Sequence, residues 1–225
     1  MLSHSGALAA VHDHGWEVVV SRLAAVLPLV AVTLGLVAPT ANAVPEKKLD
    51  DNLVALWTTV LQAPSAQNPF GSGGPASACL NIGGTIAPFG PSGAESCTVT
   101  PGTKIFVAAS AVECSTFESN GTTETELRNC ARQADVGVAP SVTVDGQSLP
   151  VSEVETPLLN IVLPEHNIFD DPPGTQPAGT TGLSVGHGWA VLLHPLAPGT
   201  HTIVIDGSVP LIKTDIIVQA DHSDF

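Results

Sequence analysis

The densest group of polar side chains in this sequence is the run Glu-His-Asn-Ile-Phe-Asp-Asp that begins at Glu165. A carboxylate beside an imidazole can transfer protons, so Glu165, His166 and Asp170 are candidate catalytic residues. The oxygens of Asn167, Asp170 and Asp171 could instead bind calcium, although the ligand spacing of an EF-hand loop is missing. Asn and Asp also close turns, and prolines flank this run. We therefore expect a structural loop here.

A further candidate acid is Glu113, which follows a buried strand-like stretch and directly precedes a cysteine. A carboxyl group partly withdrawn from water could work with a second one, such as Glu165 or Asp170, as carboxylate pairs do in glycosidases. The separation of two such groups depends on tertiary structure. A small secreted hydrolase with paired carboxylates is therefore an alternative function.

Three histidines lie in strand-like segments near the end of the chain: His187, His194 and His201. The alternation of polar and apolar residues around them predicts side chains that face solvent. A zinc site needs three ligands that converge, and nothing in the spacing brings these three together. We expect surface histidines, and the sequence predicts no metal or other cofactor.

Residues 22–43 are typical of a secretory signal peptide. Arg22 precedes a long apolar run, which ends in the small-residue motif Ala41-Asn42-Ala43. The apolar run is too short for a stable membrane span, and no later segment is long enough for one. We predict a leader at residues 1–43 and no membrane span in the mature chain. Because the first 19 residues contain no Lys or Arg, a true translation start near Val20 is a hypothesis.

The four cysteines all follow the predicted leader, and their even number predicts two disulfides formed in an oxidising compartment. Three pairings can be drawn. We favour Cys79–Cys97 and Cys114–Cys130, because each pair closes a short local loop. A zinc site is disfavoured, because no Cys-x-x-Cys spacing exists.

The charge of the chain excludes several classes of partner. The formal net charge is −14, with only seven Lys and Arg residues, so the surface repels phosphate backbones and anionic lipids. We therefore expect no nucleic-acid partner. Charged residues make up 12 % and hydrophobic residues 44 %, with 21 Gly and 19 Pro, which is typical of a turn-rich globular protein.

Two segments have helical patterns. Within residues 46–62, apolar side chains recur at three- and four-residue steps and form one stripe that includes Trp57. This pattern predicts a helix that Trp57 anchors in the core. Residues 122–134 predict a short helix with Thr122 or Thr123 at its N-cap and acids in its first turn. Its Arg128 and Arg132 should point to solvent or pair with acids.

The other periodic segments are strand-like and are separated by Pro and Gly turns. They cover residues 78–82, 96–100, 104–109, 141–144, 158–163, 183–193, 200–205 and 211–219. This pattern predicts a mainly β fold: an antiparallel β-sandwich, jelly-roll or Ig-like, with one or two short helices. Residues 44–76 would form the N-terminal helix and a Gly/Pro-rich loop, and residues 77–225 the β-sandwich domain.

Several short segments resemble a family of uncharacterised secreted bacterial proteins over nearly the whole mature chain. They are the Trp57 helix with the following AQNP, CTVTPGTK at 97–104, ECS at 113–115, VDG at 144–146, NIFD at 167–170 and LHPLAPGTHTI at 193–203. The resemblance implies export and a β-rich fold. The family has no established activity, so the resemblance implies no catalytic residues.

These observations together predict a secreted, disulfide-stabilised module, outside the cell or in its envelope, without catalytic activity. Its partner is unknown, and a cell-surface component is the class we expect. The alternative is the hydrolase described above, and a third possibility is a calcium-stabilised, adhesin-like domain, whose melting temperature a chelator would lower.

Overall fold

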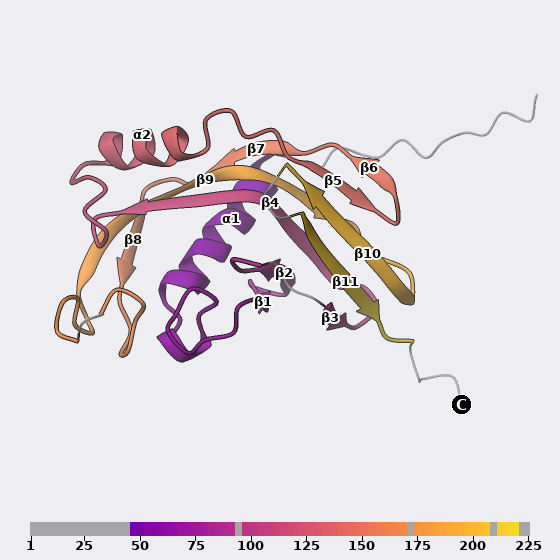
Figure 1. Cartoon of the computed structure of the whole chain (residues 1–225), viewed down its shortest axis with the longest axis horizontal. Helices are drawn as coiled ribbons and strands as arrows, with labels where there is room; N and C mark the ends of the chain where they lie inside the picture. The colour runs from indigo at the N-terminus through magenta and orange to yellow at the C-terminus, as the bar shows by residue number, and fades with distance from the viewer. Residues whose placement is uncertain (1–45, 93–95, 171–172, 208–210, 221–225) are drawn as a thin grey trace, which may run out of the picture. The chain divides into compact units, whose positions relative to one another are not determined.

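The computed structural model describes residues 46–92, 96–170, 173–207 and 211–220. The predicted leader lies outside these ranges and stays a prediction. Within them the chain forms two α-helices and eleven strands, arranged in two sheets (Figure 1). The mainly β, sandwich-like fold predicted from the sequence is confirmed.

The two sheets differ in which parts of the chain they contain. The first sheet consists of β1 (Ala78–Asn81), β2 (Thr85–Phe89), β4 (Lys104–Ser115), β9 (Thr181–Leu193) and β7 (Ser152–Glu155), in this order, with β8 (Leu159–Val162) also paired to β9. The second sheet consists of β3 (Ser96–Val99), β11 (Ile212–Val218), β10 (Gly199–Asp206), β5 (Ser141–Val144) and β6 (Gln147–Leu149), in this order.

Most strand pairs are antiparallel, but two pairs are parallel: β2 with β4, and β3 with β11. The mixed orientation follows from the turn at Pro101-Gly102. This turn does not fold β4 back beside β3; β3 pairs with β11 in the second sheet, whereas β4 enters the first. Gly102 has a φ of +84°, which glycine adopts without steric cost.

The pair Asp145-Gly146 after the strand-like residues 141–144 predicts a two-residue hairpin turn, and in the structure it joins β5 to β6, with Val144 opposite Gln147. Both turn residues have positive φ, +51° for Asp145 and +78° for Gly146, as a two-residue hairpin turn of this kind requires. The Asp-Gly signal in the sequence is therefore confirmed.

Three clusters of buried side chains form the core. The first lies between helix α1 (Glu46–Leu61) and the first sheet, the second lies between the two sheets, and the third lies under helix α2 (Glu124–Ala134). Strand β4 supplies residues to all three, since its two faces point to different clusters. The two helices cover opposite faces of the first sheet (Figure 1).

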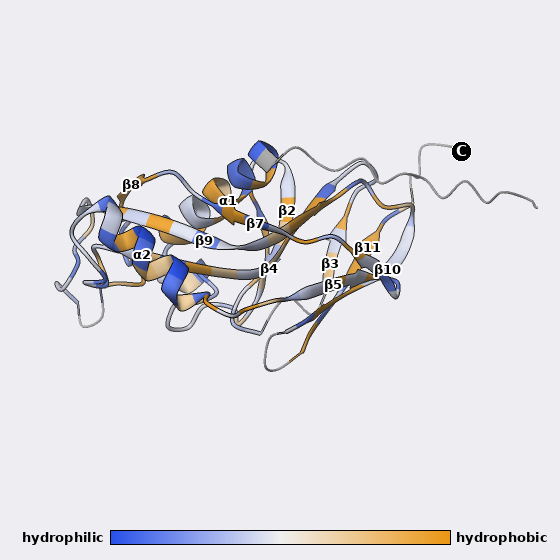
Figure 2. Cartoon of the chain, turned by 90° about the horizontal axis from the view of Figure 1, so that it is seen from above, coloured by the Kyte–Doolittle hydropathy of each residue, from blue (hydrophilic) through white to orange (hydrophobic). Residues whose placement is uncertain are grey.

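Helix α1 forms because its apolar residues share one face. All six members of the predicted stripe are buried: Leu49, Leu53, Leu56, Trp57, Val60 and Leu61. The hydrophobic positions of the helix are drawn in orange beside hydrophilic ones in blue in Figure 2. Pro64 follows the helix, and the side chain of Asn68 donates to the Val60 carbonyl oxygen near its end, at 2.6 Å. The predicted helix and the role of Trp57 in the core are confirmed.

Helix α2 begins with a capping box. Thr123 accepts a hydrogen bond from the Glu126 main-chain N–H, and the Glu126 side chain accepts one from the Thr123 N–H. Leu127 and Ala131 form its buried face against the first sheet. In the part of the chain that the structure describes, no helix is long and apolar enough to cross a membrane.

Both predicted disulfides are confirmed. Cys79–Cys97 joins β1 of the first sheet to β3 of the second, and Cys114–Cys130 joins β4 to α2. Each closes a loop of 16 to 18 residues, so each contributes about 3 kcal/mol to stability if the restriction of the unfolded chain dominates. The bridges thus fasten the second sheet and α2 to the first sheet.

Candidate functional site

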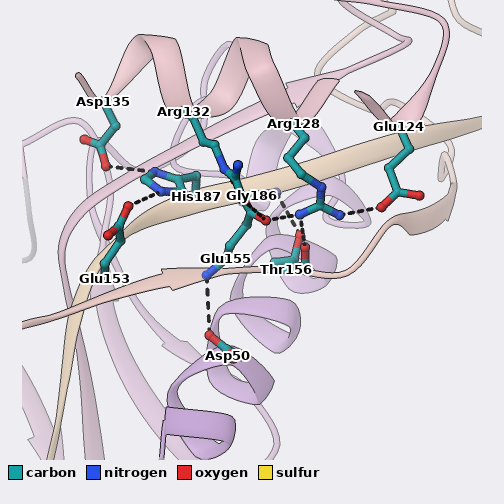
Figure 3. A network of polar contacts seen from close by, with 10 residues as sticks. All are labelled: Asp50, Glu124, Arg128, Arg132, Asp135, Glu153, Glu155, Thr156, Gly186 and His187. Carbon is teal, nitrogen blue, oxygen red and sulfur yellow. Dashed lines mark hydrogen bonds and ion pairs between the residues drawn. The ribbon is translucent and has the colours of Figure 1, made fainter. Parts of the chain in front are cut away.

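A chain of polar contacts joins the end of α2 to strands β7 and β9 (Figure 3). At its centre is His187 of β9, which is only 4 % exposed. Its Nδ1 lies 3.2 Å from Oδ2 of Asp135, and its Nε2 lies 3.0 Å from Oε1 of Glu153. Asp135 is also buried and accepts a hydrogen bond from Ser110 Oγ at 2.7 Å. Carboxylates therefore hold the imidazole at both ring nitrogens.

Local sequence places these groups together. Alternation along β9 turns Val185 and His187 toward α2 and the intervening Gly186 toward α1. Asp135 is the C-cap residue of α2, so the end of this helix brings its carboxylate to the imidazole. Gly188 lets β9 pass close to β4, since a Cβ there would lie 2.1 Å from the Ser110 carbonyl oxygen.

The prediction that His187 faces solvent is wrong. Helix α2 packs over this face of the sheet, so the outward position of β9 is buried. His194 is exposed, as predicted. His201 is partly buried: its Nδ1 lies 2.7 Å from Oδ2 of Asp145 and its Nε2 lies 2.9 Å from the Ala197 carbonyl oxygen. The hydrogen bond to Asp145 raises the pKa of His201.

The second half of the network is built around Glu155 of β7. Its carboxylate accepts a hydrogen bond from Arg128 Nη1 and another from Arg132 Nε, with 2.6 Å between Nε and Oε2. Arg128 also donates to Glu124 Oε1 at 2.5 Å, and the main-chain N–H of Glu155 donates to Asp50 of α1 at 3.4 Å. The sequence predicts that both arginines either pair with acids or point to solvent, and in the structure both pair with acids. Ion pairs thus fasten α2 to the edge strand of the first sheet.

A polar hollow of about 300 Å³ opens beside this network. It is lined by Asp50, Arg132, Glu153, Val154, Glu155 and His187. A general base needs a free nitrogen or oxygen aimed at the substrate. His187 would have to break its contact with the largely exposed Glu153 before it could accept a proton from a ligand in this hollow. The arrangement therefore suits a structural fastening better than acid–base chemistry.

We expect Glu155→Ala to lower the free energy of unfolding by about 2 kcal/mol, because it removes the carboxylate that accepts from both the partly buried Arg128 and the exposed Arg132. The matched control is Asp51→Ala, which removes an ion pair between exposed side chains on α1 and should cost less than about 0.5 kcal/mol. Urea unfolding of both variants measures the difference. Equal losses would show that the Glu155 network does not fasten α2.

Glu113 occupies a different environment from the other candidate acids. It lies on β4 opposite Gly186, and its Oε1 accepts a hydrogen bond from Ser184 Oγ at 2.5 Å. Burial raises its pKa from 4.5 to about 7; the hydrogen bond from Ser184 acts against this rise, and the nearby Glu118 adds to it by repulsion. A carboxyl group that titrates near neutral pH could exchange protons in a reaction.

Glu113 and His187 lie on opposite faces of the first sheet. Ser184, which binds Glu113, and Gly186, against which Trp57 packs, share the face toward α1. His187 is on the alternate face, toward α2. The structure therefore does not bring these two groups into one pocket, although it does bring Glu118 close to Glu113.

In the loop that contains the candidate residues 165–171, polar side chains form hydrogen bonds with main-chain N–H groups of the same loop. Asp170 Oδ1 accepts hydrogen bonds from the N–H groups of Gly174 and Gln176, and Asn167 Oδ1 accepts one from Phe169. Glu165 and His166 are exposed, and Asp171 lies outside the described residues. Within the described ranges, no group of three or more His, Cys, Asp or Glu side chains could hold a metal ion.

Sequence reasoning missed Asp135, Glu153 and Glu118. No local motif marks them, since the contacts to His187 span 52 and 34 residues of the sequence. One signal was present: a histidine between two glycines within a strand, Gly186-His187-Gly188, is unusual for a solvent-facing segment. It indicated a place where other parts of the chain approach the backbone closely.

Comparison of the chain with protein-family models, with curated proteins and with solved structures found no match.

Proposed function

We propose that this protein is an exported, disulfide-stapled module without catalytic activity, which binds a component of the cell surface or envelope. Its two disulfides are consistent with an oxidising compartment. Its net charge of −14 keeps it soluble and disfavours nucleic acid and anionic lipid as partners. The predicted leader at residues 1–43 supports export.

This proposal rests on one observation: the candidate polar side chains already form hydrogen bonds or ion pairs with other groups of the protein. Both ring nitrogens of His187 face carboxylates, and Glu155 receives two arginines. Asp170 accepts hydrogen bonds from two main-chain N–H groups of its own loop. Groups that serve a reaction are usually left available to a substrate, whereas these stabilise the fold. The arrangement favours a rigid module over an enzyme.

Export is tested by expressing the full chain in a bacterial host, fractionating the cells and measuring the intact mass after thiol alkylation. We expect a product outside the cytoplasm that begins at Val44 and carries no alkylated cysteine. A cytoplasmic product with its leader intact and free thiols would contradict the proposal.

The second candidate, a hydrolase with paired carboxylates, is favoured by one observation: the pKa of Glu113 is raised to about 7 beside a second acid, Glu118. The test is release of reducing ends from cell-wall polysaccharides and aryl glycosides, by the wild type and by Glu113→Gln. As a module, the protein releases none above background. A wild-type rate that falls at least about 100-fold in the variant would instead establish the hydrolase.

A further inference from the structure

An apolar cavity of about 340 Å³ lies where the first and second core clusters meet. Strand β4 of the first sheet forms one wall, and Ile203, Ile205 and Ile212 of the second sheet form the opposite wall. Phe89 of β2 belongs to the first cluster and also lines the cavity. Small-molecule sites in proteins have this character: concave, mostly apolar, and of at least about 300 Å³.

The cavity exists because β4 carries four small residues in succession, Ala108, Ala109, Ser110 and Ala111. The register of β4 with β9 shifts between Ala108 and Ser110, so this segment turns small side chains toward both neighbouring clusters. Larger residues there would fill the space between the sheets. The volume of the cavity is thus determined by the small residues of β4, a strand that a disulfide at Cys114 also joins to α2.

Two hydroxyl side chains line the cavity, those of Thr214 and Ser110. Thr214 of β11 is only 3 % exposed and lines the cavity. Ser110, the other hydroxyl on the wall, is already bound to Asp135. The Thr214 hydroxyl is therefore the group on this wall with which a ligand carrying one hydrogen-bonding group would pair.

The mouth of the cavity reaches the surface beside Phe70, which is 46 % exposed, and beside the exposed Pro91 and Gly207. Among the described residues that line the cavity there is no Lys, Arg, Asp or Glu. A charged head group would therefore have no counter-ion at the wall, and the chain's net charge of −14 would repel an anion.

We propose that this cavity binds a small neutral amphiphile, an apolar chain or ring system with a single hydroxyl-type head that pairs with Thr214. An apolar cavity of about 150 Å³ holds benzene, so 340 Å³ admits a molecule of roughly ten non-hydrogen atoms. This inference deepens the proposed function, because it assumes that the module binds its ligand without converting it.

The test is titration calorimetry of the full chain with 1-octanol, using sodium octanoate at pH 8 as the charged analogue. We expect one saturable octanol site per chain with a dissociation constant below about 1 mM, and octanoate binding at least about tenfold weaker. Ala109→Leu, which fills the cavity, should weaken octanol binding at least about tenfold. The control Ala134→Leu adds the same bulk on the exposed end of α2 and should bind as the wild type does.

Thr214→Val keeps the shape of the side chain and removes its hydroxyl, so it should bind octanol about fivefold more weakly. This variant decides the matter if Ala109→Leu fails to fold, as judged by circular dichroism and melting temperature. Absence of saturable binding to the wild type would overturn the inference. So would unchanged octanol affinity in a folded Ala109→Leu or Thr214→Val protein, or equal affinity for octanoate.

Failure of this test is distinguishable from failure of the proposed function. An exported protein that releases no reducing ends and binds no octanol loses only the cavity assignment. A protein that binds octanol but hydrolyses a polysaccharide through Glu113 loses only the proposal of a non-catalytic module.

Discussion

Replacement of Trp57 by alanine is expected to lower the free energy of unfolding by about 4 kcal/mol, because truncating a buried Trp leaves a large cavity. The indole is 6 % exposed and packs edge-on against Phe89, with ring centroids 5.5 Å apart. It also lies directly on Gly186, where a Cβ would come within 2.3 Å of the indole Cδ1. Trp57 thus joins α1 to both β2 and β9.

The measurement is urea unfolding followed by far-ultraviolet circular dichroism with both disulfides intact. Trp57→Phe is the matched control, because it keeps an aromatic ring and removes an indole N–H that is buried without a partner in the described chain. Its loss should be about 1.5 kcal/mol or less. A loss below about 1 kcal/mol for Trp57→Ala would mean that the indole does not anchor α1.

Glu113→Gln is expected to change how stability depends on pH. The pKa of Glu113 is raised from 4.5 to about 7, chiefly by burial, so the folded chain binds this proton more tightly than the unfolded chain. Between these two values the folded protein keeps a proton that the unfolded protein has released. Stability therefore falls as the pH rises through this window, by about 3 kcal/mol in total.

Glutamine stays neutral and can still accept the hydrogen bond from Ser184, so the variant lacks this loss. Relative to the wild type, it should gain about 3 kcal/mol between pH 4.5 and pH 8, as measured by urea unfolding at both values. Glu165→Gln, at an exposed position, controls for the removal of one negative charge. The same change in stability from pH 4.5 to pH 8 in the wild type and Glu113→Gln would contradict the burial of this carboxyl group.

Much of the secondary structure was predictable, because its causes are local. The stripe of α1 and the capping box of α2 are patterns within a single turn or a few turns of helix. The Asp145-Gly146 hairpin depends on two residues with positive φ. Both disulfides close short loops, so their pairing also followed from proximity in the sequence. Strands β2 and β7 were missed: β2 contains Pro88, which is unusual within a strand, and β7 is only four residues long, two of them glutamates.

Sequence alone determined the helices, most strands, the disulfide pairs and the acidic character of this protein. Only the tertiary structure decided that β3 pairs with the distant β11, that α2 covers His187, and that Glu118 rather than Glu165 or Asp170 lies near Glu113. The physical reason is that helix periodicity and turn geometry depend on neighbours along the chain. The burial and charge of a side chain depend on whatever the fold packs against it.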